Sequence, residues 1–407
     1  MFVDDPASEY RLVDQFTLAD LEAIRVVLRG GSVIDWHRLN FRDDADIAEF
    51  LRTHEFDIEN DRDLRRIEEV KLEAIDYLRR NFEFPIPASI EDAEALELFR
   101  LASSKGHKQV CACIVLKAMH IIHHLQGREL LFMLPLSDAQ VFRLVEEKVF
   151  RVVGGMLAAG LPIVEFLGGR KNRDSLYTKL LSKSETIAAQ IYDKLRFRIV
   201  TRTRDDLFPV MNLLSRRLFP YNYAIPGQST NTLVDFPAYC RQHPQLEEML
   251  QYAQGGALDD SASAFTDNVF SAKSYRVIHF VVDLPVRVPA EVIAAAGPNA
   301  SALGHVIFAL VEFQIVDQAT DATNEMGDAS HARYKERQRL AVMDRLRMGF
   351  RSHARKSHED KTMEHVAAVG LPVPEPVLMA EPIPPMTPLA PRESRPARPR
   401  TSRPPKR

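Results

Sequence analysis

The sequence predicts an α+β protein in three parts: a helical region over residues 1–155, a domain of alternating strands and helices over 156–350, and a tail over 351–407. Capping signals and apolar residues spaced by three and four, typical of amphipathic helices, predict the first part. Runs of β-branched and aromatic residues, typical of strands, predict the second. The tail is rich in proline and arginine and cannot bury a core, so we expect it to be disordered.

Length and composition narrow the class of protein. The 407 residues allow two or three compact units, and a formal net charge of −3 gives no overall footprint for nucleic acid. Three cysteines, Cys111, Cys113 and Cys240, are too few for a disulfide scaffold. The N-terminal segment lacks signal-peptide features, and the longest apolar run, 110–122, is interrupted by Lys117 and is shorter than a bilayer span. We expect a soluble cytoplasmic protein without a membrane contact.

Local signals place the helices of the first part. Thr17 is suited to cap a helix that Gly30 ends. Residues 61–80 form a charged amphipathic pattern, and Ser137 with Gln140 makes a capping box. Each of these signals predicts one helix boundary.

A histidine- and cysteine-bearing helix in this region raises the question of a metal site. Cys113, His120 and His124 would lie along one helical face. Ligand pairs of structural zinc sites usually come from turns, however, and this segment is apolar nearly all round, as buried core helices are. We therefore expect a core helix here and no metal.

Residues 305–315 predict a strand in which Glu312 and Gln314 share one face, while Val311 and Phe313 share the other. A carboxylate on an otherwise apolar strand costs solvation unless it has a role or a partner. Glu312 is therefore the first candidate for a functional residue. A small-residue stripe in the next segment predicts a helix that packs closely on a sheet; its members are Ala319, Ala322, Met326 and Ala329.

Basic residues follow a short strand that ends in glycines near residue 169. Lys171, Ser175 and Lys179 are spaced by four along a helix start, so all three face one way. Cations and a hydroxyl near a helix N-terminus form a cradle for polyphosphate. A solvated basic turn is the alternative, and spacing alone favours it.

Two further strands are predicted on either side of a polar segment. In the first, Arg196 and Arg198 lie on one face opposite apolar residues; the second places Tyr275 and His279 on one face. Between them, residues 227–270 look like an insertion. Long segments of this kind are usually lids or disordered. A loosely docked lid and a surface excursion without influence on the site both stay open.

Four motifs in these stretches resemble, in order, those of the RelA/SpoT family of alarmone synthetases. They are K-x-x-x-S-x-x-x-K at Lys171, Ser175 and Lys179, D-x-x-x-x-R at Asp193 and Arg198, Y-x-x-x-H at Tyr275 and His279, and E-x-Q-I from Glu312 to Ile315. The last is followed, as in the family, by a segment that contains Gly327, Ala329, His331, Tyr334 and Lys335.

The resemblance implies a mixed β-sheet flanked by helices, related to nucleotidyltransferases. It implies transfer of pyrophosphate from ATP to the 3′-hydroxyl of GDP or GTP, with Mg²⁺ as cofactor and (p)ppGpp and AMP as products. Glu312 and Asp193 would be the catalytic residues and the metal ligands. The implied ATP-binding residues are Lys171, Ser175, Lys179, Arg170 and Arg198, and the implied acceptor-binding residues are Tyr275, His279 and Gln314.

Several positions depart from the family pattern. Gly169 stands where the family has an arginine, with Arg170 shifted by one, and Arg196 replaces a small residue. Val316 and Asp317 replace an Arg-Thr pair, and the His-Asp signature of the family's hydrolase half is missing. Three classes therefore stay open: an active alarmone synthetase, an enzyme that pyrophosphorylates another 3′-hydroxyl such as an adenine nucleotide or a tRNA end, and a catalytically dead nucleotide-binding regulator.

The C-terminal part is basic. A strongly basic helix is expected from residue 335 to about 355, followed by the proline-rich tail. Such a tail is able to touch RNA or acidic partners weakly, although a solvated tail is the commoner case.

Overall fold

The computed structural model describes residues 5–30, 33–34, 36, 39–182, 194–254, 274–326 and 332–347. They belong, except for Arg347, to one compact unit that spans residues 1–346. Asp193, residues 255–270 of the expected insertion, residues 327–331 and the tail over 351–407 lie outside the described residues.

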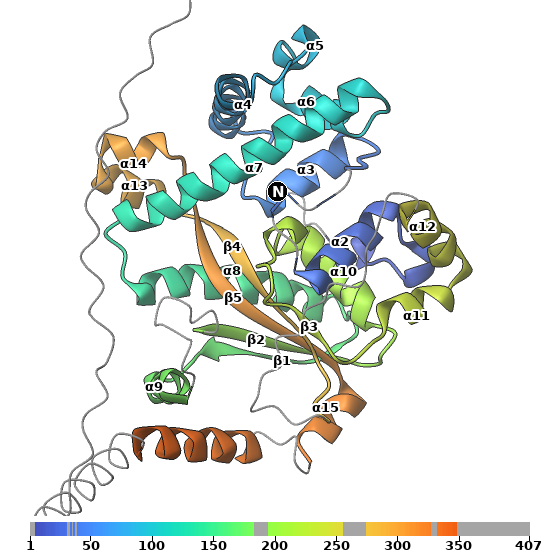
Figure 1. Cartoon of the computed structure of the whole chain (residues 1–407), viewed down its shortest axis with the longest axis vertical. Helices are drawn as coiled ribbons and strands as arrows, with labels where there is room; N and C mark the ends of the chain where they lie inside the picture. Colours follow the sequence, from blue (N-terminus) through green and yellow to red (C-terminus); the bar gives the residue numbers. More distant parts are fainter. Residues whose placement is uncertain are drawn as a thin grey trace, which may run out of the picture. The chain divides into compact units, whose positions relative to one another are not determined.

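The N-terminal part is helical (Figure 1). Thr17 and Asp20 form a capping box at the start of the second helix, Gly30 ends it with φ 66°, and Ser137 and Gln140 form the predicted box further on. The elements are α1 Pro6–Glu9, η1 Val13–Gln15, α2 Leu18–Arg29, α3 Asp44–Thr53, α4 Asp61–Phe82, α5 Ala88–Glu91, α6 Ala95–Ala102, α7 His107–Met133 and α8 Asp138–Ala158.

A five-stranded mixed sheet forms the second part, in the order β1-β2-β5-β4-β3. β2 and β5 run parallel, and the other neighbours are antiparallel. The α+β architecture with a mixed sheet flanked by helices agrees with the expectation from the sequence. The strands are β1 Ile163–Arg170, β2 Leu195–Thr201, β3 Thr230–Asn231, β4 Ile278–Arg287 and β5 Val306–Asp317.

Helices connect and flank these strands. They are α9 Arg173–Ser182, α10 Leu207–Arg217, η3 Tyr221–Tyr223, α11 Phe236–Arg241, α12 Pro244–Gln254, α13 Ala290–Ala296, α14 Pro298–Ala302, α15 Gln318–Asn324 and a last helix over 332–347. The last helix packs on α9, because Gln338 donates to Ser182 Oγ at 3.3 Å and Arg345 donates to the carbonyls of Leu180 and Leu181 (Figure 1).

Alternation along the strands gives the sheet two unlike faces. Phe197 of β2, Phe313 of β5 and Phe280 of β4 stack in a row, with ring centroids 5.9 and 5.6 Å apart. Phe150 of α8 and Phe219, just after α10, cover this row. The alternate residues of the same strands point to the opposite face, where the polar residues lie.

The helical part joins the sheet where α7 crosses β5. A Cβ added to Gly127 would lie 2.5 Å from the Phe308 ring and 2.8 Å from the Val306 carbonyl oxygen. The absence of a side chain at Gly127 thus allows the helix to approach the strand this closely. On the same helix, His120 is buried, and burial lowers its pKa well below the usual range.

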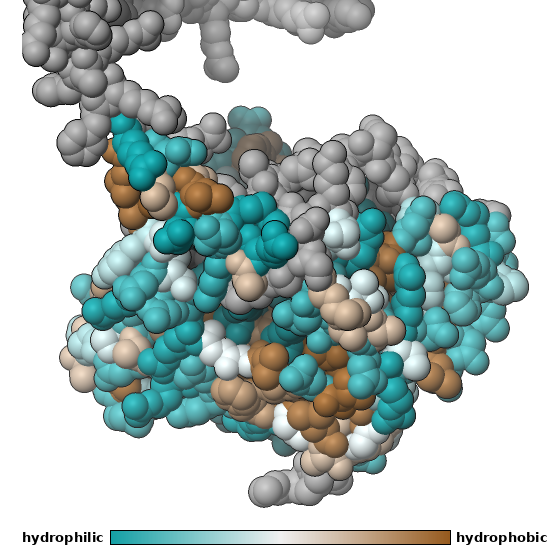
Figure 2. Space-filling view, turned by 90° about the horizontal axis from the view of Figure 1, so that it is seen from below, coloured by the Kyte–Doolittle hydropathy of each residue, from teal (hydrophilic) through white to brown (hydrophobic). Residues whose placement is uncertain are grey.

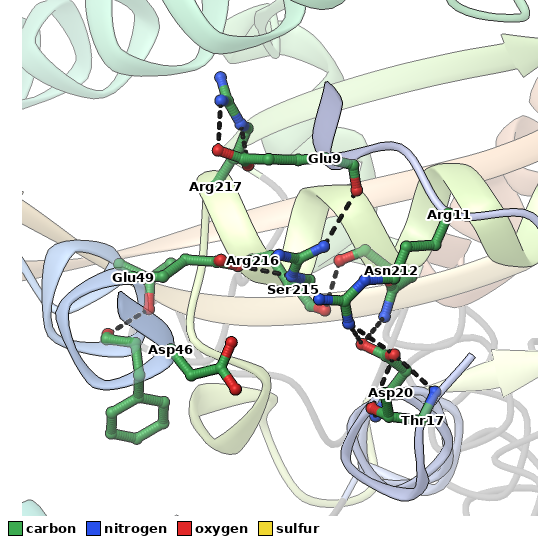
Figure 3. A network of polar contacts seen from close by, with 12 residues as sticks. Glu9, Arg11, Thr17, Asp20, Asp46, Glu49, Asn212, Ser215, Arg216 and Arg217 are labelled. Atoms are coloured by element: carbon green, nitrogen blue, oxygen red, sulfur yellow. Dashed lines mark hydrogen bonds and ion pairs between the residues drawn. The ribbon is translucent and has the colours of Figure 1, made fainter. Parts of the chain in front are cut away.

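A buried carboxylate ties the N-terminal segment to α10 (Figure 3). Asp20 accepts hydrogen bonds from Asn212 at 2.8 Å and from Arg11 at 2.8 and 3.0 Å. Nearby, Arg217 of α10 makes a two-point ion pair with Glu9. These contacts join segments about 200 positions apart, so the helical part is bound to the sheet-bearing part by polar contacts as well as by apolar packing.

The expectation of a loosely docked insertion is wrong for residues 227–254. β3 pairs with β4, and Tyr239, Cys240 and Leu246 of α11 and α12 are buried in the same core as the sheet. Replacing this segment by a flexible linker would remove a strand and part of the core.

The predicted small-residue stripe is also corrected. α15 ends at Asn324, and Ala319, Ala322 and Met326 are exposed. Asn324 is buried instead, because its side chain bonds the backbone N–H and carbonyl of Arg276. The helix therefore contacts the segment just before β4 through the hydrogen bonds of Asn324, here called the polar clamp, rather than through alanines.

Two surface features of the fold concern apolar residues. α7 is long and apolar enough to cross a membrane by length and composition alone, although half of its most apolar 18-residue stretch is buried inside the protein.

Edge strand β1 and helix α8 expose Leu167, Val164 and Phe150. Figure 2 shows hydrophobic side chains gathered among hydrophilic ones on the face seen from below.

The close approach of α7 to β5 can be tested with a matched pair of glycine-to-alanine substitutions. We predict that Gly127→Ala lowers the free energy of unfolding by about 1–3 kcal/mol, because the new methyl group overpacks the crossing. Gly154→Ala, in α8, where no atom of the described part of the chain lies within 4 Å of the added Cβ, should raise it by about 0.5–1 kcal/mol. Urea denaturation of the full chain measures both. Equal stability of the two variants would contradict the close approach.

Candidate active site

Glu312 lies in the central strand and is 4% exposed. Its Oε1 accepts a hydrogen bond from Gln314 Nε2 at 2.8 Å, and His279 Nε2 of β4 lies 3.3 Å from the same oxygen. The carboxylate predicted as the first functional candidate is thus buried and held by an amide and an imidazole.

Strand register explains why these residues meet. Glu312 pairs with Arg196 of β2, and Gln314 pairs with Arg198 of β2 on one side and with His279 of β4 on the other. Directly paired residues point to the same face of a sheet. Arg196, Arg198, His279, Glu312 and Gln314 therefore form one row, called the polar face below, opposite the row of phenylalanines.

Tyr275 precedes β4 and is half-buried beside the polar face. Burial raises the pKa of its phenol, while the nearby charges of Arg198 and Arg196 lower it and that of Glu312 raises it. Tyr275 is thus within electrostatic range of three members of the polar face, and its acceptor-binding role stays a prediction.

Arg198 is already paired with an acid that the sequence reasoning missed. Its guanidinium forms an ion pair with Asp321 of α15, and Nη1 lies 3.9 Å from Glu325 Oε1. Asp317, Asp321 and Glu325 recur at spacings of four, so an acidic face on this helix was visible in the sequence. The prediction from the alanine stripe assigned the packing of this helix to the wrong face.

Arg170 does not join this group, contrary to its predicted place among the ATP-binding residues. It pairs with Leu195, which belongs to the apolar face. Its guanidinium donates to both oxygens of Glu146 at 2.8 and 3.0 Å and lies over the Phe142 ring, both in α8. A shift of one position along a strand moves a side chain to the other face, and this explains the difference.

The predicted phosphate cradle lies at the turn from β1 into α9. Lys171, Ser175 and Lys179 are all half-buried, as residues on one side of a helix are. The Lys171 N–H donates to the Lys194 carbonyl at 2.9 Å, so the cradle is tied to the start of β2. Asn172 Oδ1 accepts from the Asp174 N–H at 2.9 Å and caps the helix. The phosphate-binding role of the three residues stays a prediction.

The two residues that replace the Arg-Thr pair have structural roles. Val316 is fully buried at the end of β5. Asp317 caps α15, since it accepts from the Thr320 N–H at 2.9 Å and from the Thr320 hydroxyl at 2.6 Å. These contacts fix the point at which the strand becomes a helix.

Magnesium is usually held by one or two carboxylates together with substrate phosphates. Glu312 fits one such position, and Asp193, its predicted partner, lies outside the described residues. In the part of the chain that the structure describes, no group of three or more histidine, cysteine or acidic side chains is arranged to hold a metal ion by itself.

The chain is similar to solved structures of small alarmone synthetases. Synthetase 2 from Bacillus subtilis matches with 16% identity over 55% of this chain and 97% of its own, at a TM-score of 0.26. Synthetase 1 from the same organism matches with 18% identity over 55% and 100%, also at 0.26. A GTP pyrophosphokinase family protein from Streptococcus pneumoniae matches with 16% identity over 55% and 97%, at 0.25.

No family model and no curated protein matches the chain.

Because Arg170 points to α8 and Arg198 lies on the polar face, their substitutions should affect nucleotide binding differently. Arg170→Ala should change the affinity for a non-hydrolysable ATP analogue less than about twofold, since it removes only an exposed ion pair with α8. Arg198→Ala should weaken the same binding by about tenfold or more, since it removes a cation from the polar face. Isothermal titration calorimetry measures both. A larger loss from Arg170→Ala would contradict the assignment of faces.

Proposed function

We propose that this protein transfers pyrophosphate from ATP to the 3′-hydroxyl of GDP or GTP. The observation that carries the proposal is the environment of Glu312, a buried carboxylate whose oxygen is held by Gln314 and His279 on a face that also bears arginines. A buried acid with fixed donors is typical of a catalytic group. The order of the four motifs in the sequence supports the same reaction.

In the proposed reaction, Glu312 takes the proton from the 3′-hydroxyl of the acceptor. The 3′-oxygen forms a bond to the β-phosphorus of ATP, the bond from that phosphorus to the α–β bridging oxygen breaks, and AMP leaves. Gln314 and His279 fix the carboxylate so that one orientation faces the hydroxyl, which is the positioning that general-base catalysis needs.

Cations would bind the polyphosphate and stabilise its charge in the transition state. Lys171, Ser175 and Lys179 would bind it at the α9 turn, and Arg198 would bind it from the sheet. Asp193 and Glu312 would hold magnesium, which neutralises phosphate charge in reactions of this class. Tyr275 would stack on the guanine of the acceptor.

The test is incubation of the purified chain with labelled ATP, magnesium and a panel of acceptors: GDP, GTP, adenine nucleotides and tRNA. Formation of AMP and a more highly charged guanine nucleotide supports the proposal. Product with an adenine nucleotide or tRNA alone would replace the acceptor while keeping the reaction class.

A second candidate, a nucleotide-binding regulator without turnover, is favoured by one observation. Arg198, the arginine of the D-x-x-x-x-R motif on the polar face, already forms an ion pair with Asp321. Tight binding of ATP with no product from any acceptor in the panel would establish this candidate.

We predict that Glu312→Gln lowers the turnover number at least about 10²-fold, because the amide cannot accept the proton. Nucleotide affinity should stay nearly intact, since the side-chain shape is kept. Glu291→Gln, at an exposed position of α13, is the charge-matched control and should retain full activity. A Glu312→Gln variant that turns over at the wild-type rate would remove Glu312 from the mechanism.

Tyr275→Ala should weaken binding of the acceptor by about 1–3 kcal/mol while leaving ATP binding nearly unchanged, because only the acceptor base stacks on the ring. Separate titrations with GDP and with the ATP analogue measure the two losses. Equal losses would show that Tyr275 is a packing residue.

A further inference from the structure

Gly169 of β1 and Arg196 of β2 are directly paired in the antiparallel ladder. Their side-chain positions therefore lie on the same face of the sheet. Among the described residues, a Cβ added to Gly169 would meet no atom within 4 Å, so these residues leave the surface beside Arg196 open. Gly169 does not have a positive φ, so its backbone does not require glycine.

Arg196 also pairs with Glu312 on its other side, in the parallel ladder. It is thus placed between the open surface over Gly169 and the buried carboxylate of Glu312. An exposed guanidinium at this position is flanked by room for a ligand on one side and by the proposed base on the other.

The neighbouring arginines differ from Arg196 in their partners. Arg198 is paired with Asp321, and Arg170 is paired with Glu146 on the other face. Among the described residues, no carboxylate forms an ion pair with Arg196. Because Arg196 has no such ion pair among the described residues, it can attract a polyanion without first breaking an internal ion pair.

We propose that Arg196 is a phosphate-binding residue of the active site, and that the polyphosphate of a nucleoside triphosphate lies over Gly169, beside Arg196 and on the side away from Glu312. This inference rests on the proposed function and adds a residue to it. The guanidinium presents paired N–H donors that match phosphate oxygens. Gly169 acts by leaving the space into which the phosphate fits.

Four variants of the full chain test this: Arg196→Ala, Arg196→Lys, the exchange variant Gly169→Arg/Arg196→Ala, and Arg143→Ala as the control. Arg143 is an exposed arginine of α8, on the apolar side of the sheet, and its loss changes the net charge equally. Titration with a non-hydrolysable ATP analogue in magnesium gives the dissociation constant, and thermal melting reports the fold.

Arg196→Ala should weaken the analogue by about 10- to 100-fold without lowering the melting temperature, and Arg196→Lys should lie between it and the wild type. The exchange variant should recover most of the affinity, because an arginine at 169 reaches the same space from the adjacent strand. Arg143→Ala should bind like the wild type.

Wild-type affinity in Arg196→Ala, or an exchange variant no better than Arg196→Ala, would overturn the inference. The labelled-ATP assay keeps it distinct from the proposed function. If the wild type makes product while Arg196→Ala keeps affinity and rate, the inference alone fails. If the wild type binds the analogue but makes no product, the proposed function fails and the binding series still decides Arg196. A wild type that binds no analogue overturns both.

Discussion

The burial of one carboxylate in the central strand is the constraint on which the rest of this site depends. An acid in an apolar sheet is costly unless fixed donors surround it. β5 meets the constraint through its neighbours, since Gln314 supplies an amide two residues away and His279 supplies an imidazole from β4. The His279 contact needs the register of β4 and β5 to be correct, and the stacked phenylalanines on the opposite face hold that register.

The two faces of the sheet therefore have separate tasks. The apolar face carries the stacked phenylalanines and is covered by α8 and by the residues after α10, while the other face is available for polar residues. A slip of one residue in any strand would exchange the two sets. This coupling explains why the polar face can present several charges without loss of fold: the energy that fixes their positions comes from side chains on the opposite face.

Much of this arrangement was predictable from the sequence, because alternation and capping are local. The parity of Glu312 with Gln314, and the caps at Thr17 and Ser137, needed no tertiary information. Strand order did need it. Only the order β1-β2-β5-β4 shows that Gly169 adjoins Arg196, and only the pairing with Leu195 shows that Arg170 points to α8.

Tertiary context also decided the two helical corrections. The polar composition of residues 227–254 suggested weak attachment, yet a few buried residues, Tyr239, Cys240 and Leu246, are enough to place this segment in the core. In α15 the polar clamp through Asn324 outweighed a stripe of alanines, which bury little apolar area. Composition predicts the average behaviour of a segment, whereas a few contacts determine its docking.

The ion pair between Arg198 and Asp321 affects which anions could bind to the polar face under the proposed function. A phosphate that binds Arg198 must replace Asp321, and the free energy of that ion pair is subtracted from the affinity. A singly charged anion gains too little to offset this loss, whereas a polyphosphate contacts several cations at once. Under the proposed function, this internal pair would favour multiply charged ligands over singly charged ones at Arg198.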